Sequence, residues 1–179
     1  MGHSFRSRLE HDLDGGVSVI QMKDLTDDNR LDVSDLAVVD LKNLKESHRV
    51  KAQDLAFRSR GQTNKAAIIN RHFDEAVIAA PLLRIRVKIE GILPEYLCWF
   101  INQPVSQRFL QSRATGTAAR MIGKTAVESL KVVIPSLEKQ RKIIELERLA
   151  IAEQRLMKEI AEIKNQYVEG VLMQYASGS

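Results

Sequence analysis

Hydrophobic and polar residues alternate along several short stretches of the chain. The alternation is most regular over residues 83–89, where apolar residues are separated by Arg84, Arg86 and Lys88. Because successive side chains of a strand point to opposite faces, this pattern predicts a half-buried strand whose cationic face is exposed to solvent. The same reasoning, with turn residues as boundaries, predicts strands over residues 17–21, 54–61, 66–69, 76–80 and 131–134.

Two prolines mark the starts of two predicted helices. Residues 94–102 begin at Pro94 and are apolar on nearly every side, so we expect a core helix, and Pro104 begins a second helix. Proline is favoured in the first turn of a helix and disfavoured inside one. A short helix is predicted over residues 125–130, whereas residues 31–41 are compatible with a strand or a short helix. This mixture predicts an α+β domain.

The end of the chain, residues 137–175, has no internal proline and predicts one long helix. Its apolar positions follow steps of three and four, a heptad pattern typical of a coiled coil. At 1.5 Å per residue such a helix is roughly 58 Å long, so a single compact core cannot cover its whole apolar stripe. We expect it to pair with another chain; the alternative is that its first half packs on its own domain and its end frays. The expected dimer interface consists of Leu146, Leu149, Glu153, Leu156, Ile160, Ile163 and Tyr167.

Length and composition describe an ordinary globular protein with an appendage. The chain has 179 residues, of which 44% are hydrophobic and 28% charged, and we expect a domain of residues 1–135 followed by a helix of residues 136–179. The single cysteine, Cys98, lies in an apolar run and predicts a buried thiol in a reducing compartment. No apolar run approaches the roughly 20 residues that span a bilayer. We therefore expect a cytoplasmic protein without a membrane partner.

Charge is distributed unevenly along the chain. Residues 1–44 hold five basic and nine acidic side chains, whereas residues 45–131 hold fifteen basic and seven acidic ones. A basic cluster of this kind is typical of a face that binds a polyanion, and it is also compatible with a solvated basic surface.

Two loops in the basic part carry the residue types that read DNA. Guanidinium groups bind guanine edges, amides bind adenine edges, and hydroxyls bind phosphates. The loops span residues 58–65 and 113–124, and each contains glycine. Each is compatible with an exposed polar turn or with a DNA contact. The predicted DNA-binding residues are Arg58, Arg60, Gln62, Asn64, Lys65, Arg113, Thr115, Thr117, Arg120 and Lys124.

Catalytic chemistry is not indicated by the sequence. It has no glycine-rich phosphate loop and no His and Cys spacing typical of a metal site, and its four histidines are scattered. We therefore predict a non-enzyme without a metal or cofactor.

Several motifs resemble the specificity subunit of type I restriction-modification systems. They are GILPEYLCWFINQPVSQRFLQSRATGT from Gly91, MIGKTAVESLKVVIPSLEKQRKI from Met121, VIQMKDL from Val19 and DLAFRSRG from Asp54. The resemblance implies a target recognition domain that reads double-stranded DNA, while a modification (methyltransferase) subunit and a restriction subunit carry out methylation and cleavage. The family usually has two recognition domains and two long helices, and this chain has one of each.

The single recognition domain implies a half-subunit that forms a homodimer to read a bipartite site. Two alternatives stay open. One is a coiled-coil adaptor whose basic domain binds an acidic protein. The other is a truncated specificity subunit that competes for the modification subunit without recognising DNA.

Overall fold

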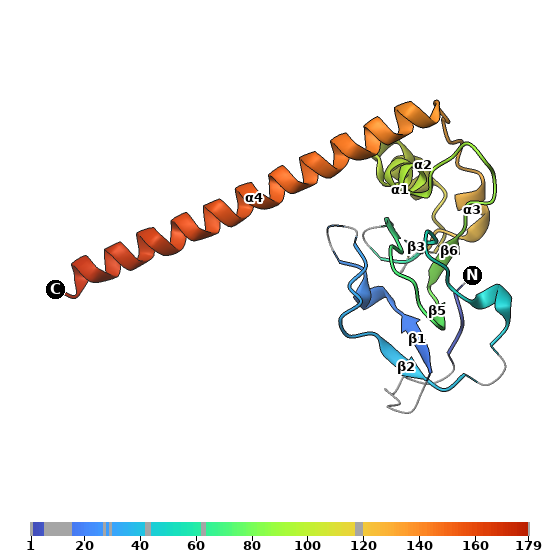
Figure 1. The fold of residues 1–179 in the computed structure, drawn as a ribbon, viewed down its shortest axis with the longest axis horizontal. Helices are drawn as coiled ribbons and strands as arrows, with labels where there is room; N and C mark the ends of the chain where they lie inside the picture. The colour runs from blue at the N-terminus through green and yellow to red at the C-terminus, as the bar shows by residue number, and fades with distance from the viewer. Residues whose placement is uncertain are drawn as a thin grey trace. The chain divides into compact units, whose positions relative to one another are not determined.

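The chain divides into two compact units, Met1–Leu137 and Glu138–Ser179, in the computed structural model (Figure 1). The structure describes residues 2–5, 16–26, 28, 30–41, 44–61, 64–116 and 120–178. The first unit contains β1 (Val17–Ile20), η1 (Met22–Asp24), β2 (Ala37–Val39), η2 (Glu46–His48), β3 (Leu55–Arg58), β4 (Ala66–Ile68), β5 (Ala76–Ile78), β6 (Leu82–Ile85), α1 (Pro94–Asn102), α2 (Pro104–Ser112) and α3 (Lys124–Glu128). Helix α4 spans Leu137–Ala176, and all of it except its first residue belongs to the second unit.

These elements confirm the predicted α+β class and most of the predicted segments. Strands form within residues 17–21, 54–61, 66–69 and 76–80, and the two helices that begin at prolines start where expected. The undecided stretch of residues 31–41 contains a strand, β2.

The strands form two three-stranded sheets. In the first sheet, of order β2-β1-β5, β1 pairs antiparallel with β2 and parallel with β5. In the second, of order β4-β3-β6, β3 pairs antiparallel with both neighbours. Strand β3 is therefore central, and its side chains are buried on both faces.

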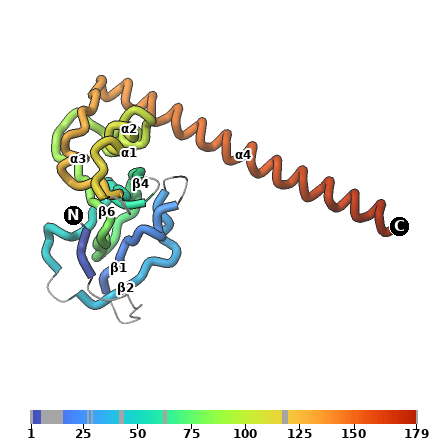
Figure 2. The backbone as a smooth tube through the Cα atoms, turned by 180° about the vertical axis from the view of Figure 1, so that it is seen from behind, coloured from blue at the N-terminus to red at the C-terminus, as the bar shows by residue number. Residues whose placement is uncertain are grey.

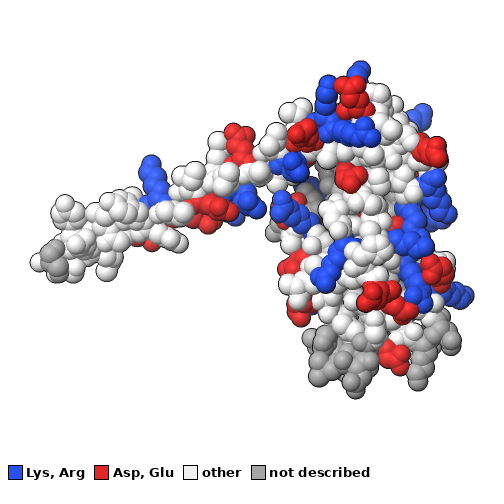
Figure 3. Space-filling view, in the orientation of Figure 1, with Lys and Arg blue, Asp and Glu red and all other residues white. Residues whose placement is uncertain are grey.

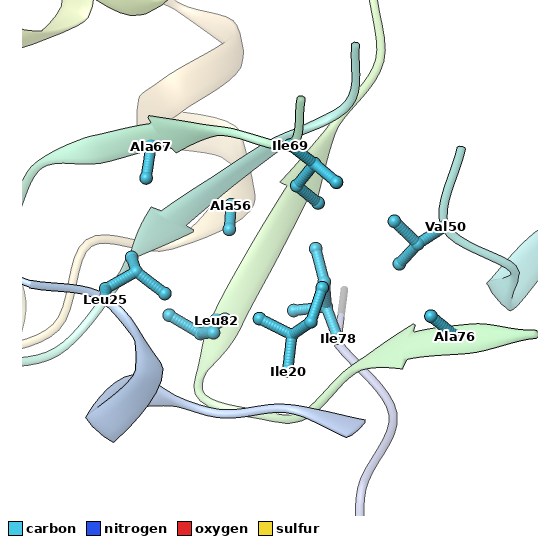
Figure 4. Packing of buried hydrophobic residues seen from close by; sticks show 9 residues of the cluster. All are labelled: Ile20, Leu25, Val50, Ala56, Ala67, Ile69, Ala76, Ile78 and Leu82. Atoms are coloured by element: carbon cyan, nitrogen blue, oxygen red, sulfur yellow. The ribbon is translucent and has the colours of Figure 1, made fainter. Parts of the chain in front are cut away.

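Alternation along β3 places its side chains in two of the three hydrophobic clusters. Ala56 points towards the first sheet and joins a cluster with Ile20 and Ile78 (Figure 4). Leu55 and Phe57 point the other way and pack with residues of α1, α2 and the segment that precedes α3. The second sheet thus lies between the first sheet and the helices, which Figures 1 and 2 show on the far side of β3 and β6.

Strand β6 corrects the prediction that Arg84 and Arg86 merely solvate an exposed face. The strand ends at Ile85, and both guanidinium groups turn towards Asp54, which is 1% exposed. Arg86 binds the Asp54 carboxylate through two hydrogen bonds of 2.6 Å, which raise the pKa of Arg86. Arg84 Nε lies 3.9 Å from the same carboxylate. Only Lys88, among these three cations, has an exposed side chain as predicted.

The strand predicted over residues 131–134 is wrong. These residues have no regular structure, and Val133 and Ile134 are exposed. The Val133 carbonyl accepts a hydrogen bond of 2.7 Å from the Tyr96 hydroxyl instead of pairing with a strand. A short apolar run before Pro135 is extended, but it needs a neighbouring strand edge to form a ladder, and no such pairing occurs among the described residues.

Cys98 confirms the predicted buried thiol and allows a test of the packing. Its thiol donates to the Ala66 carbonyl at 3.4 Å, and burial raises its pKa from 9.0 to about 12. Because the thiolate is the reactive form, we expect iodoacetamide to alkylate the folded chain at pH 8 far more slowly than the urea-unfolded chain. Equal rates, measured by mass spectrometry with free cysteine as reference, would contradict this packing.

Candidate nucleic-acid interface

The two loops predicted to contact DNA meet in the structure. Met121 and Thr115 exchange backbone hydrogen bonds of 2.8 and 3.0 Å, and Met121 also forms an antiparallel bridge with Arg60. The Ile122 amide donates to the Ser59 carbonyl at 2.7 Å. Backbone pairing therefore places Arg60 of the first loop and Thr115 of the second loop on either side of Met121.

Alternation along this paired segment sorts its side chains onto two faces. Ile122 is 0% exposed and packs in the core beside the helices, whereas Met121 is 44% exposed. Residues directly opposite each other in an antiparallel pair point to the same face. The side chains of Arg60, Met121 and Thr115 therefore form a row on the outer face, which we call the outer row, and all three are exposed.

Two arginines flank the outer row on the second loop. The Arg113 guanidinium lies over the Phe109 ring, 4.0 Å from its centroid, and this contact fixes the direction of the side chain. Arg120 donates to the Gln111 carbonyl at 3.1 Å. Both side chains are exposed, so their charge is available to an anionic partner.

Two lysines predicted for the site have different surroundings. Lys124 begins α3 and its ammonium lies 3.3 Å from the carboxylate of Glu128, in an exposed pair that contributes little to stability. Lys65 is half-buried, and its carbonyl accepts the Arg58 amide at the end of β3. Lys124 is therefore the more accessible of the two.

Arg58 and Asn64, also predicted to bind DNA, have side chains that form hydrogen bonds within the protein. Arg58 donates to the carbonyls of Met22, at 3.3 Å, and Leu25. The buried Asn64 amide donates to the Arg58 carbonyl at 3.1 Å. Both residues hold the first loop in shape. Gln62 and Thr117, also predicted for the site, lie outside the described residues.

Two supporting residues were missed by the sequence reasoning. The buried Ser59 hydroxyl donates to the Pro81 carbonyl, and Gln107 donates at 2.8 Å to the carbonyls of Asn64 and Ile101. Ser59 sits between two arginines in an alternating stretch, so its inward direction follows from the period of two. Gln107 gives no such signal, since Asn64 lies 43 positions away.

The positive charge of the middle segment is only partly available at the surface. Figure 3 shows Lys and Arg gathered along one edge of the first unit, with Asp and Glu among them. Arg49 binds Glu75 at 2.5 Å, and Lys51 binds Glu46 at 3.0 Å. Together with the two arginines near Asp54, these cations of the middle segment are engaged in ion pairs within the protein. Arg60, in contrast, has no ion pair among the described residues.

Helix α4 carries the residues of the expected dimer interface, which we call the seam. The apolar residues of the seam are exposed within the second unit. It is a single helix of 40 residues, drawn without interruption in Figure 2. The six apolar seam residues, between Leu146 and Tyr167, are 52–72% exposed. At position 153 the seam is interrupted by an acidic residue. Such a helix has many apolar side chains that its own unit does not cover.

Metal-ligand side chains do not cluster in the part of the chain that the structure describes: no three of His, Cys, Asp or Glu come together as a candidate metal site. None of the helices formed by these residues is long and apolar enough to cross a membrane. The outer row itself offers a guanidinium, a thioether and a hydroxyl, which can bind a ligand.

The structure thus consists of an α+β unit and a long helix with an exposed apolar seam. Residues 1–165 match the family described as type I restriction modification DNA specificity domain, and the chain belongs to this family. The family is a DNA-recognition component of restriction-modification systems and is not itself catalytic.

One solved structure supports the same fold. It is the crystal structure of the HsdS subunit from Thermoanaerobacter tengcongensis, with a TM-score of 0.65 and 15% sequence identity. The similarity covers 80% of this chain and 37% of that subunit, so the chain spans well under half of its length. No curated protein sequence matches the chain.

Proposed function

We propose that this chain is a half-subunit that recognises double-stranded DNA through the outer row and its flanking cations. The observation that carries this proposal is the backbone pairing that places Arg60 and Thr115 on one face beside Met121. Adjacent strands lie about 4.8 Å apart, so three such side chains span about 10 Å, which fits a major groove about 12 Å wide. Arg113, Arg120 and Lys124 then contact phosphates and hold the row in register.

Partner subunits complete the proposed function. Two copies pair through the seam of α4 and read a bipartite site, while a modification (methyltransferase) subunit, and a restriction subunit where one is present, act on the DNA. The exposure of the seam supports this arrangement.

Arg60→Ala tests the recognition face directly. The Arg60 guanidinium has no ion pair among the described residues, so it can form a bidentate contact with a guanine edge. Loss of that contact should cost about 1–3 kcal/mol on the preferred sequence and relax the preference at one position. Fluorescence anisotropy with the preferred duplex and with single-base variants measures both effects.

Two variants serve as controls for Arg60→Ala. Arg71→Ala removes the same charge at an exposed position outside the outer row, where the guanidinium lies 5.8 Å from the centroid of the Phe73 ring, and it should leave sequence preference unchanged. Lys124→Ala should weaken binding to all sequences alike. It should also reduce the slope of log affinity against log salt concentration by about one, as for a phosphate contact. An equal loss on every sequence with Arg60→Ala would reassign Arg60 to the phosphate backbone.

The main alternative is a truncated specificity subunit or coiled-coil adaptor that binds a partner protein without specific DNA recognition. The exposed seam of α4 fits this alternative equally well. The two functions differ in how binding depends on salt. When binding neutralises several phosphates, the logarithm of the affinity falls linearly with the logarithm of the salt concentration. Absence of binding to a random duplex pool at low salt would favour the adaptor.

A further inference from the structure

Met121 is a large apolar residue whose backbone is fixed by pairing and whose side chain is exposed. Its backbone is paired on both sides, to Thr115 and to Arg60, so its side chain is presented from a fixed backbone. The neighbouring Ile122 is completely buried, whereas Met121 is exposed and belongs to none of the hydrophobic clusters. Single exposed apolar residues are common, so exposure alone carries no argument.

The position of Met121 within the outer row carries the argument. It stands between a guanidinium and a hydroxyl, with cations flanking the row, and the three side chains share one face. On a DNA groove the two polar neighbours meet acceptors and donors of base edges or phosphates. An apolar side chain finds only one apolar group in the major groove, the C5-methyl of thymine.

We propose that Met121 is a specificity-determining residue that contacts the C5-methyl group of a thymine in the recognised sequence. This inference rests on the proposed DNA recognition by the outer row. The thioether side chain is flexible and polarisable, and it adapts to a methyl group better than a branched side chain does. Since adjacent strands lie about 4.8 Å apart and base pairs rise by 3.4 Å, the thymine lies within about two base pairs of the position that Arg60 contacts.

Methyl deletion in the DNA tests this contact. The preferred duplex is first selected from a random pool with the full chain, and each of its thymines is then replaced by uracil, which lacks only the C5-methyl. We expect one replacement to weaken wild-type binding about four-fold, the effect of one buried methyl-sized group. Met121→Ala should bind the original duplex more weakly by at least this factor and should no longer respond to that replacement.

Two controls separate this contact from a general loss of binding. Met173→Ala truncates an exposed methionine of α4 and should retain the wild-type response to uracil. Thermal unfolding of Met121→Ala should be close to that of the wild type, because Met121 is exposed and belongs to none of the hydrophobic clusters.

Two outcomes would overturn the inference about Met121 and leave DNA recognition standing. One is that no thymine-to-uracil replacement changes the affinity of the wild-type chain for the preferred duplex. The other is a Met121→Ala variant that responds to uracil as strongly as the wild type. Failure to bind any duplex of the pool at low salt would instead overturn the proposed function on which the inference rests.

Discussion

Replacing Arg86 with methionine is expected to destabilise the first unit by about 3 kcal/mol. The change keeps an unbranched apolar stem but removes both hydrogen bonds to Asp54, whose carboxylate is almost completely buried. Breaking a buried ion pair by removing one partner costs about 3–5 kcal/mol, because a charge is left without compensation. Arg86 is one quarter exposed and Arg84 remains 3.9 Å away, so the lower end applies. Urea unfolding followed by circular dichroism measures the loss.

The chain offers a matched control and a second variant for this experiment. Lys88→Met removes an exposed cation from the same segment. It should change the free energy of unfolding by less than about 0.5 kcal/mol, as is usual for a substitution at the surface. Asp54→Asn combined with Arg86→Met should be more stable than Arg86→Met alone, since no buried charge then lacks a partner. An Arg86→Met variant as stable as the wild type would refute the role of the pair.

The Asp54 pair shows why the sequence predicts a strand more reliably than it predicts the surroundings of that strand. The alternation around Arg84 correctly indicates extended backbone with a period of two. It does not indicate what lies opposite. The register of β3 with β6 pairs Leu55 with Ile85, which brings Asp54 to Arg86 across 32 positions of sequence. Such a partner depends on the fold, and local alternation cannot reveal it.

At the candidate site, too, the sequence predicts the local segments but not the contacts between them. Both loops were identified from their residue types, and helices α1 and α2 were predicted from their prolines. The sequence did not distinguish Arg60 from Arg58, although the structure exposes the first and binds the second to carbonyls near η1. It also gave no reason to choose Met121, because the backbone of Met121 pairs with Arg60, which is distant in sequence, as well as with Thr115 of its own loop.

The apolar seam of α4 makes a second large effect testable. We expect the wild-type chain to sediment as a dimer at micromolar concentration, with two antiparallel α4 helices related by a two-fold axis. Residues Leu156 and Ile160 are among the central apolar positions of the seam and are exposed within their own unit. Leu156→Glu with Ile160→Glu places four acidic side chains in the paired seam, which should give monomers.

A matched variant and a polar position of the helix refine this model. Gln154→Glu with Asn165→Glu adds the same charge at exposed positions outside the seam and should leave the dimer intact. Glu153 interrupts the seam and can set the register if a cation of the other copy reaches it. Arg155, one of the cations considered for this contact, lies 3.6 Å from Glu159 of its own helix.

Loss of the dimer should weaken DNA binding far more than loss of any single contact. Two linked recognition domains bind a split site with an avidity gain of about 10²–10⁴, so the Leu156→Glu and Ile160→Glu variant should lose at least about 100-fold in affinity for an inverted repeat. Both domains must meet the duplex from the same side, and the half-sites should therefore lie about 34 Å, or one helical turn, apart. Adding half a turn of spacer should weaken wild-type binding and leave the monomeric variant unaffected. A wild-type chain that stays monomeric even with the modification subunit and DNA present would refute the dimer and favour a subunit that competes for its partner protein.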